Sequence, residues 1–170
     1  ASTADAAVAQ NDIDISGAPT VTEWNSNIVG KAFLVTGSDG DLDLISFESS
    51  TTGTMYGLSG EDNGIQETFT YSYSYDNQNE GVIFYKGAPY LNGKMYPTVP
   101  ADTMIQWSTD IDLKFTDWYN GTYSESQGKD KIVDSGDVIY QDNSPSSGSF
   151  SVIKDVNVYI QQNFTASTGN

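Results

Sequence analysis

Three aspartates at alternate positions, Asp39, Asp41 and Asp43, form the one short stretch of this sequence whose spacing suits a metal ion. Carboxylate oxygens from such a loop can converge on calcium, a hard cation that takes about six to eight oxygen ligands. The pattern departs from a helix–loop–helix calcium loop, because Leu44 stands where that loop needs glycine and no glutamate follows at its end. We therefore expect either a calcium site at these aspartates or a solvated turn that leads into a strand.

Tyrosine and tryptophan recur along the chain and offer a second kind of chemistry. Their rings could form a platform for sugar rings, line the mouth of a barrel that holds a small apolar ligand, or lie in a subunit interface. The same residue types are common on half-buried strands, where they only pack. The candidate ligand-binding residues are Tyr71, Tyr73, Trp107 and Trp118.

The composition lacks the catalytic apparatus of the common kinds. The chain has no Cys, His or Arg, which excludes the usual zinc, haem and iron–sulfur sites and the Ser/His/Asp and Cys/His nucleophile systems. Two carboxylates could still act as the acid and base of a glycosidase. Acidic side chains are also the ordinary solvated face of strands, and their separation cannot be read from a sequence. We expect no enzymatic activity.

Charge and hydropathy restrict the partners. The chain of 170 residues carries 23 acidic and 7 basic side chains, for a net charge of −16. Nucleic-acid binding depends on Lys and Arg, so we expect no nucleic-acid partner. No apolar run approaches the roughly 20 residues of a membrane helix, which predicts no membrane span. The first ten residues lack an initiator Met and a basic, then apolar leader, so we read them as a processed end and expect an extracellular or cell-surface protein.

Alternation of apolar and polar residues predicts the elements that must position these side chains. In residues 67–75, Phe69, Tyr71 and Tyr73 fall on one side of a strand and the intervening Thr and Ser residues on the other. Further strands are expected at residues 13–15, 20–24, 32–36, 42–47, 82–85, 104–107, 111–115, 138–141, 150–153 and 156–160.

Turn signals lie between these strands, as at Asn63-Gly64, Asn120-Gly121 and Ser135-Gly136. The only helix candidate is residues 3–10, which is short. We expect an all-β fold of about ten mostly antiparallel strands, either a β-sandwich of the jelly-roll or Ig-like kind or a small barrel.

The chain divides into three parts on composition. Residues 1–16 form an N-terminal tail, 17–162 a single β domain and 163–170 a C-terminal tail. In the first tail, Ile13 and Ile15 alternate with acidic residues and could add a strand to the exposed sheet edge of a neighbouring subunit. The same segment could equally be the first strand of its own domain.

Two functions follow from these features. The first is an extracellular structural subunit that assembles with copies of itself into a filament, sheath or surface layer through β-strand contacts, with calcium as an aid. The composition, rich in Ser, Thr, Asn, Gly and Asp, favours it. The alternative is a monomeric secreted binding module for carbohydrate or a small apolar ligand, which would use the aromatic residues.

Overall fold

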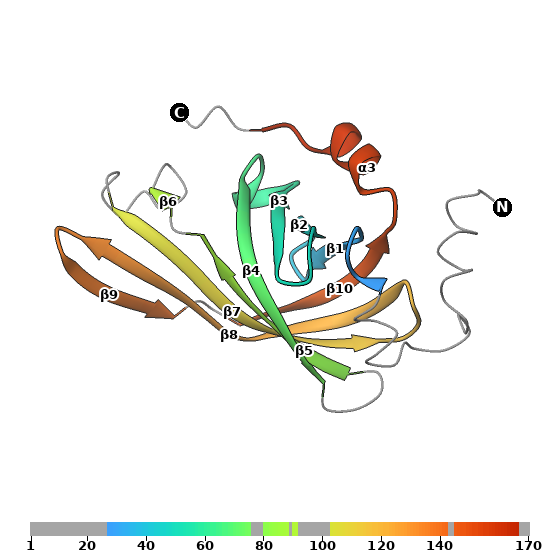
Figure 1. The fold of residues 1–170 in the computed structure, drawn as a ribbon, viewed down its shortest axis with the longest axis horizontal. Coiled ribbons are helices and arrows are strands. Elements are labelled where there is room, and N and C mark those ends of the chain that lie inside the picture. The colour runs from blue at the N-terminus through green and yellow to red at the C-terminus, as the bar shows by residue number, and fades with distance from the viewer. Residues whose placement is uncertain (1–26, 76–79, 89, 92–102, 143–144, 167–170) are drawn as a thin grey trace.

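The computed structural model describes residues 27–75, 80–88, 90–91, 103–142 and 145–166, which form ten strands, one 3-10 turn and one α-helix (Figure 1). The strands are β1 (Ala32–Gly37), β2 (Leu42–Phe47), β3 (Thr52–Gly57), β4 (Gln66–Tyr75), β5 (Glu80–Gly87), β6 (Tyr90–Leu91), β7 (Met104–Phe115), β8 (Asn120–Asp134), β9 (Asp137–Asp142) and β10 (Ser146–Ile153). The 3-10 turn is η1 (Gly60–Asp62) and the α-helix is α3 (Val156–Asn163). No helix of this described part has the length and apolarity to cross a membrane.

The strands form one sheet in the order β6-β7-β5-β4-β3-β2-β1-β10-β8-β9, and every described pairing is antiparallel. An additional pairing between β7 and β8 joins the sheet to itself, so that eight strands close into a barrel. The short β6 and the hairpin strand β9 continue beyond this ring. The prediction of an all-β, mostly antiparallel fold of about ten strands is confirmed.

Apolar side chains of alternate residues fill the inside of the barrel. On β4, Phe69 and Tyr71 are buried while Thr68 and Thr70 are exposed, as the period of a half-buried strand requires. Four phenylalanines from β1, β2, β7 and β10 form the centre of this core: Phe33, Phe47, Phe115 and Phe150. The ring of Phe33 lies 4.7 Å from that of Phe150 and 5.2 Å from that of Phe47, centroid to centroid.

A second, smaller apolar cluster lies on the outside of the barrel, where α3 covers the outer face of β1, β2 and β3 (Figure 1). The strand expected at residues 156–160 is wrong, because this segment is helical. Its apolar side chains at positions i, i+3, i+4 and i+8 contact the barrel: Val156, Tyr159, Ile160 and Phe164. Val158, which a strand would bury, is 42% exposed.

Two other local expectations are also corrected. Residues 104–107 and 111–115 belong to one strand, β7, and Asn120-Gly121 begins β8 instead of forming a turn. Gly121 serves close packing, because a Cβ atom there would lie 2.3 Å from the ring of Phe150. The expected turns at Asn63-Gly64 and Ser135-Gly136 are present.

Candidate functional site

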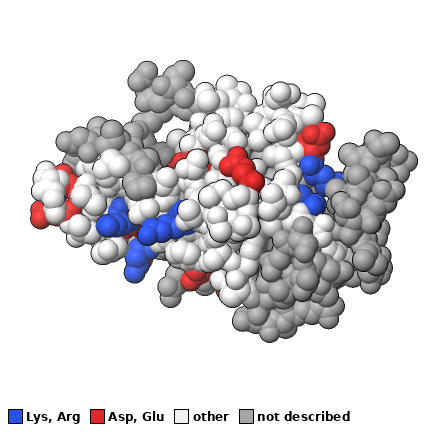
Figure 2. Space-filling model, viewed as in Figure 1, with Lys and Arg blue, Asp and Glu red and all other residues white. Residues whose placement is uncertain are grey.

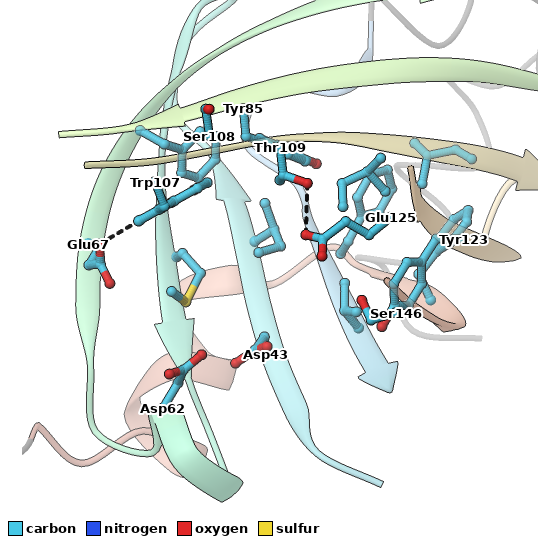
Figure 3. Close-up of a pocket in the computed structure, with 18 of the residues that line it drawn as sticks. Asp43, Asp62, Glu67, Tyr85, Trp107, Ser108, Thr109, Tyr123, Glu125 and Ser146 are labelled. Atoms are coloured by element: carbon cyan, nitrogen blue, oxygen red, sulfur yellow. Dashed lines mark hydrogen bonds between the residues drawn. The ribbon is translucent and has the colours of Figure 1, made fainter. Parts of the chain in front are cut away.

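The inside of the barrel is not completely filled and holds a cavity of about 250 Å³ (Figure 3). Its wall is mostly apolar and aromatic, formed by Phe33, Val35, Ile45, Met55, Phe69, Tyr85, Trp107, Ile111, Leu113, Tyr123 and Phe150. Eight polar residues complete it: Asp43, Asp62, Glu67, Ser108, Thr109, Glu125, Asp130 and Ser146. Five of these eight are acidic, and no lysine is among the lining residues.

A β-bulge explains how one strand contributes two of these acids. Glu125 and Asp130 are five residues apart on β8 and would face opposite sides of a regular strand. The β7–β8 register shifts between Asp110 and Ile111, where the pairing passes from Gln127 directly to Glu125. The extra residue changes which side chains face inward. Both carboxylates therefore line the cavity.

Trp107 holds one side of the Glu67 carboxylate. Oε2 of Glu67 accepts a 2.6 Å hydrogen bond from Nε1 of Trp107, whereas its Oε1 is buried with no hydrogen-bond partner among the described residues (Figure 3). Burial raises the pKa of Glu67, the hydrogen bond from Trp107 lowers it, and the charges of Asp62 and Asp130 raise it; the resulting pKa is about 7.

Glycine makes room for the indole beside this carboxylate. A Cβ atom on Gly87 of β5 would lie 2.4 Å from Nε1 of Trp107, so any larger residue would displace the ring. The side chain of Gln106 donates a 2.8 Å hydrogen bond to the carbonyl oxygen of Gly87, which holds β5 and β7 together at this point. The position of Trp107 is thus fixed by close contact with the backbone at Gly87 and by the hydrogen bond to Glu67.

Asp43 and Asp62 face one another across the end of the cavity that lies between β2 and η1 (Figure 3). Burial, together with the charges of Asp62, Asp41 and Asp39, raises the pKa of Asp43 to about 7. A like charge nearby makes ionisation of Asp43 harder.

Glu125 and Tyr123 line the side formed by β8. The hydroxyl of Thr109 donates a 2.7 Å hydrogen bond to Oε2 of Glu125 (Figure 3). Burial raises the pKa of the Tyr123 phenol, and the charges of Asp43 and Glu125 add to this effect. The phenol therefore stays neutral at physiological pH and can donate or accept a hydrogen bond.

Lysine side chains are visible on the surface in Figure 2 in two groups, one on the side where β8 and β9 extend from the barrel and one on the opposite side. Lys129 forms an exposed pair with Asp142 at 3.7 Å, and Lys154 lies 5.0 Å from the ring centre of Tyr119. None of the lysines that the structure describes lines the cavity.

The three aspartates predicted to bind calcium lie at the β1–β2 turn. The backbone NH of Asp41 donates a 3.0 Å hydrogen bond to Oδ1 of Asp39, and Asp43 is the member that lines the cavity. In the described part of the chain, no group of acidic side chains has the arrangement of a metal site. Calcium binding by Asp39, Asp41 and Asp43 stays a prediction.

Only one of the four aromatic candidates lines the cavity. Trp107 does so, whereas Tyr71 and Trp118 are buried in the core and Tyr73 packs against it. The hydroxyl of Tyr71 donates to the carbonyl oxygen of Ser49, a structural role. Ile13 and Ile15, expected to mediate assembly, lie outside the described residues.

Sequence reasoning missed the acids of the cavity apart from Asp43. One signal was available for Glu67, which has the same parity as Phe69, Tyr71 and Tyr73 in the clearest predicted strand and so had to face inward.

In comparisons with known proteins, no protein-family model, no curated protein and no solved structure matches this chain.

Proposed function

We propose that this protein binds a small organic molecule inside the barrel. The observation that carries the proposal is the cavity of about 250 Å³ with mostly apolar walls. Sites for small molecules are concave and mostly apolar, as this space is. One water occupies about 30 Å³ of liquid, so this partly open space has room for several waters or for a small organic molecule.

The size of the cavity limits its occupant. An apolar cavity of about 150 Å³ accepts benzene, which suggests on the order of ten non-hydrogen atoms for the present one. Apolar walls with a few convergent polar groups are typical of sites for small molecules. Of the two ligand classes that the sequence left open, a small molecule with an apolar body fits these walls better than a sugar chain.

Filling the cavity should abolish binding. We expect Val35→Phe, which places a ring in the cavity from β1, to lose the calorimetric signal that the parent protein gives with 2-phenylethanol. Val138→Phe is the matched control, since Val138 is 50% exposed on β9. Circular dichroism verifies that both variants fold. Equal binding by both variants, or no binding of neutral, cationic and anionic aromatic compounds by the parent at millimolar concentration, would contradict the proposal.

A second function, self-association, is supported by a different observation. All six residues of β9 are exposed, and among the described strands β9 pairs only with β8. Val138, Ile139 and Tyr140 are 50%, 55% and 62% exposed. An exposed edge strand that carries apolar side chains is a template for pairing with another chain, and a second copy of β9 can pair with it around a two-fold axis.

A charge on this edge should prevent that pairing. We expect Ile139→Lys to remain monomeric at concentrations where the parent protein forms dimers or larger species, as measured by sedimentation velocity. Val158→Lys on α3 is the control, because Val158 is also an exposed aliphatic side chain, at 42%, but lies away from the edge. A parent protein that stays monomeric at high concentration would exclude self-association through β9.

A further inference from the structure

The distribution of charge in the cavity carries information about the ligand beyond its size. Five carboxylates from β2, η1, β4 and β8 line a space that is otherwise mostly apolar, and none of the lysines in the described part of the chain lines it. An ionised carboxylate removed from water costs free energy unless a positive charge or several hydrogen-bond donors compensate it. A cationic ligand would supply such a charge, whereas an anionic ligand would be repelled.

One acceptor atom is positioned for a donor that the described protein does not supply. Oε1 of Glu67 is buried without a partner, while Oε2 of the same carboxylate is held by Trp107. A buried acceptor without a partner is costly, so a donor from the ligand gains more there than at the surface. Because Trp107 fixes the carboxylate, Oε1 is already oriented before a ligand arrives.

The apolar part of the wall determines what kind of cation fits. A bare divalent ion requires oxygen ligands around its whole sphere, whereas eleven of the nineteen lining residues are apolar or aromatic. The aromatic rings of Phe69, Tyr85 and Trp107 lie on three adjacent strands, with the ring of Phe69 5.1 Å from that of Tyr85 and 6.4 Å from that of Trp107, which contacts Glu67. Aromatic faces attract organic ammonium groups and also bind an apolar body.

We propose that the ligand is an organic cation, a protonated amine on an apolar body of about ten non-hydrogen atoms, whose ammonium group is held by Glu67. This inference rests on the proposed binding function. The ammonium donates to the unpartnered Oε1 of Glu67, and the charge of Asp62, which acts on both Glu67 and Asp43, also attracts it. The body of the ligand lies against the apolar wall.

Binding should depend on pH because the carboxylate of Glu67, whose buried Oε1 has no partner among the described residues, must be ionised to hold the ammonium. Its pKa is about 7. Glu67 faces Asp62 on η1, Asp130 on β8 and the indole of Trp107 on β7. A bound cation lowers this pKa, so binding releases protons near pH 7 and strengthens as the pH rises from 6 to 8.

A matched set of three compounds tests the charge. The probes are 2-phenylethylamine, which is a cation, 2-phenylethanol, which is neutral, and phenylacetate, which is an anion; calorimetry is performed with each. We expect the amine to bind the parent protein at least about tenfold more tightly than the alcohol, and phenylacetate to bind most weakly. Calcium chloride is a fourth titrant, because a metal ion would compete for the same carboxylates.

Variants in which an amide replaces a carboxylate test whether Glu67 and Asp43 cause the preference for the amine. Glu67→Gln keeps an acceptor for the indole of Trp107. The double variant, Glu67→Gln with Asp43→Asn, is expected to lower the affinity for 2-phenylethylamine about tenfold and to leave the affinity for 2-phenylethanol unchanged. Asp142→Asn is the control, since it removes one charge from an exposed side chain outside the cavity. Proton release is measured by calorimetry in two buffers with different ionisation enthalpies.

The outcomes separate this inference from the function on which it rests. If none of the three compounds binds, both are overturned. If the alcohol or phenylacetate binds as tightly as the amine, if calcium displaces the amine with higher affinity, or if the amide variants behave like Asp142→Asn, the cavity binds a ligand but the assignment of an organic cation is wrong.

Discussion

At pH 8, replacing two of the five cavity carboxylates by amides, Asp43→Asn with Glu67→Gln, is expected to raise the free energy of unfolding by about 3 kcal/mol. Each unit of pKa shift corresponds to about 1.4 kcal/mol. The rises from 3.8 and 4.5 to about 7 set an upper limit of roughly 8 kcal/mol. Contact with water in the cavity and coupling between the acids reduce the expected gain to less than half of this limit.

The direction in which the stability of the fold changes with pH follows from the raised pKa values of Asp43 and Glu67. Below about pH 3, both carboxyl groups are protonated in the folded and the unfolded chain, and they cost no stability. Between pH 4 and 7, the unfolded chain releases its protons first, so the stability of the fold decreases as the pH rises; above 7 the loss is complete. The parent protein should thus have a higher melting temperature at pH 5 than at pH 8, and the double variant a flatter profile.

Scanning calorimetry at pH 5 and pH 8 measures both effects. The control is Asp137→Asn with Asp142→Asn, which removes the same number of charges from the exposed strand β9 and accounts for the general repulsion in a chain of net charge −16. Parallel pH profiles of the parent and the cavity variant would show that Asp43 and Glu67 are ordinary surface acids in solution.

The loss of stability expected from Asp43 and Glu67 above pH 7 favours a functional role for these two carboxylates. A protein that needed only a stable barrel would gain from apolar residues at positions 43 and 67, since buried ionised groups destabilise and hydrophobic replacements of similar size often do not. Active and binding sites commonly lower stability in this way. A cation in the cavity would recover the lost free energy through mass action, so a rise in melting temperature with 2-phenylethylamine should be larger at pH 8 than at pH 5.

Alternation predicted much of the barrel but not the features that form the site. Strands with clear period two, such as β4, were predicted within one residue. β8 escaped prediction because its fifteen residues contain few apolar side chains: one end lines the cavity with Tyr123 and Glu125 and the other extends beyond the ring. A bulge leaves no trace in composition, so the inward position of both Glu125 and Asp130 could not be foreseen.

The helix α3 shows where a prediction of strands from alternating apolar residues fails. Val156, Val158 and Ile160 alternate as a strand would, yet Val156, Tyr159 and Ile160 also fit helical spacing. The barrel decides between them, because Ala32, Leu44 and Tyr56 leave an apolar patch on its outer face that a short helix covers. A cavity is similarly a property of the closed sheet and cannot be read from any one strand.

Phe33→Ala is expected to lower the free energy of unfolding by about 4 kcal/mol, because Phe33 is 1% exposed and its ring contacts those of Phe47, Phe115 and Phe150 on three other strands. Chemical denaturation measures the loss. Phe84→Ala is the matched control: Phe84 is 40% exposed on β5, and its loss should cost less than about 1 kcal/mol.

Phe33 also lines the cavity, which gives the same substitution a second, independent readout. Removing its ring joins the vacated space to the existing cavity, so the variant should bind bulkier amines, such as a naphthyl analogue of 2-phenylethylamine, that the parent protein excludes. The destabilisation alone would follow from any tightly packed core. A variant that is destabilised but has the same preference for ligand size as the parent would show that the cavity beside Phe33 is not where the ligand binds.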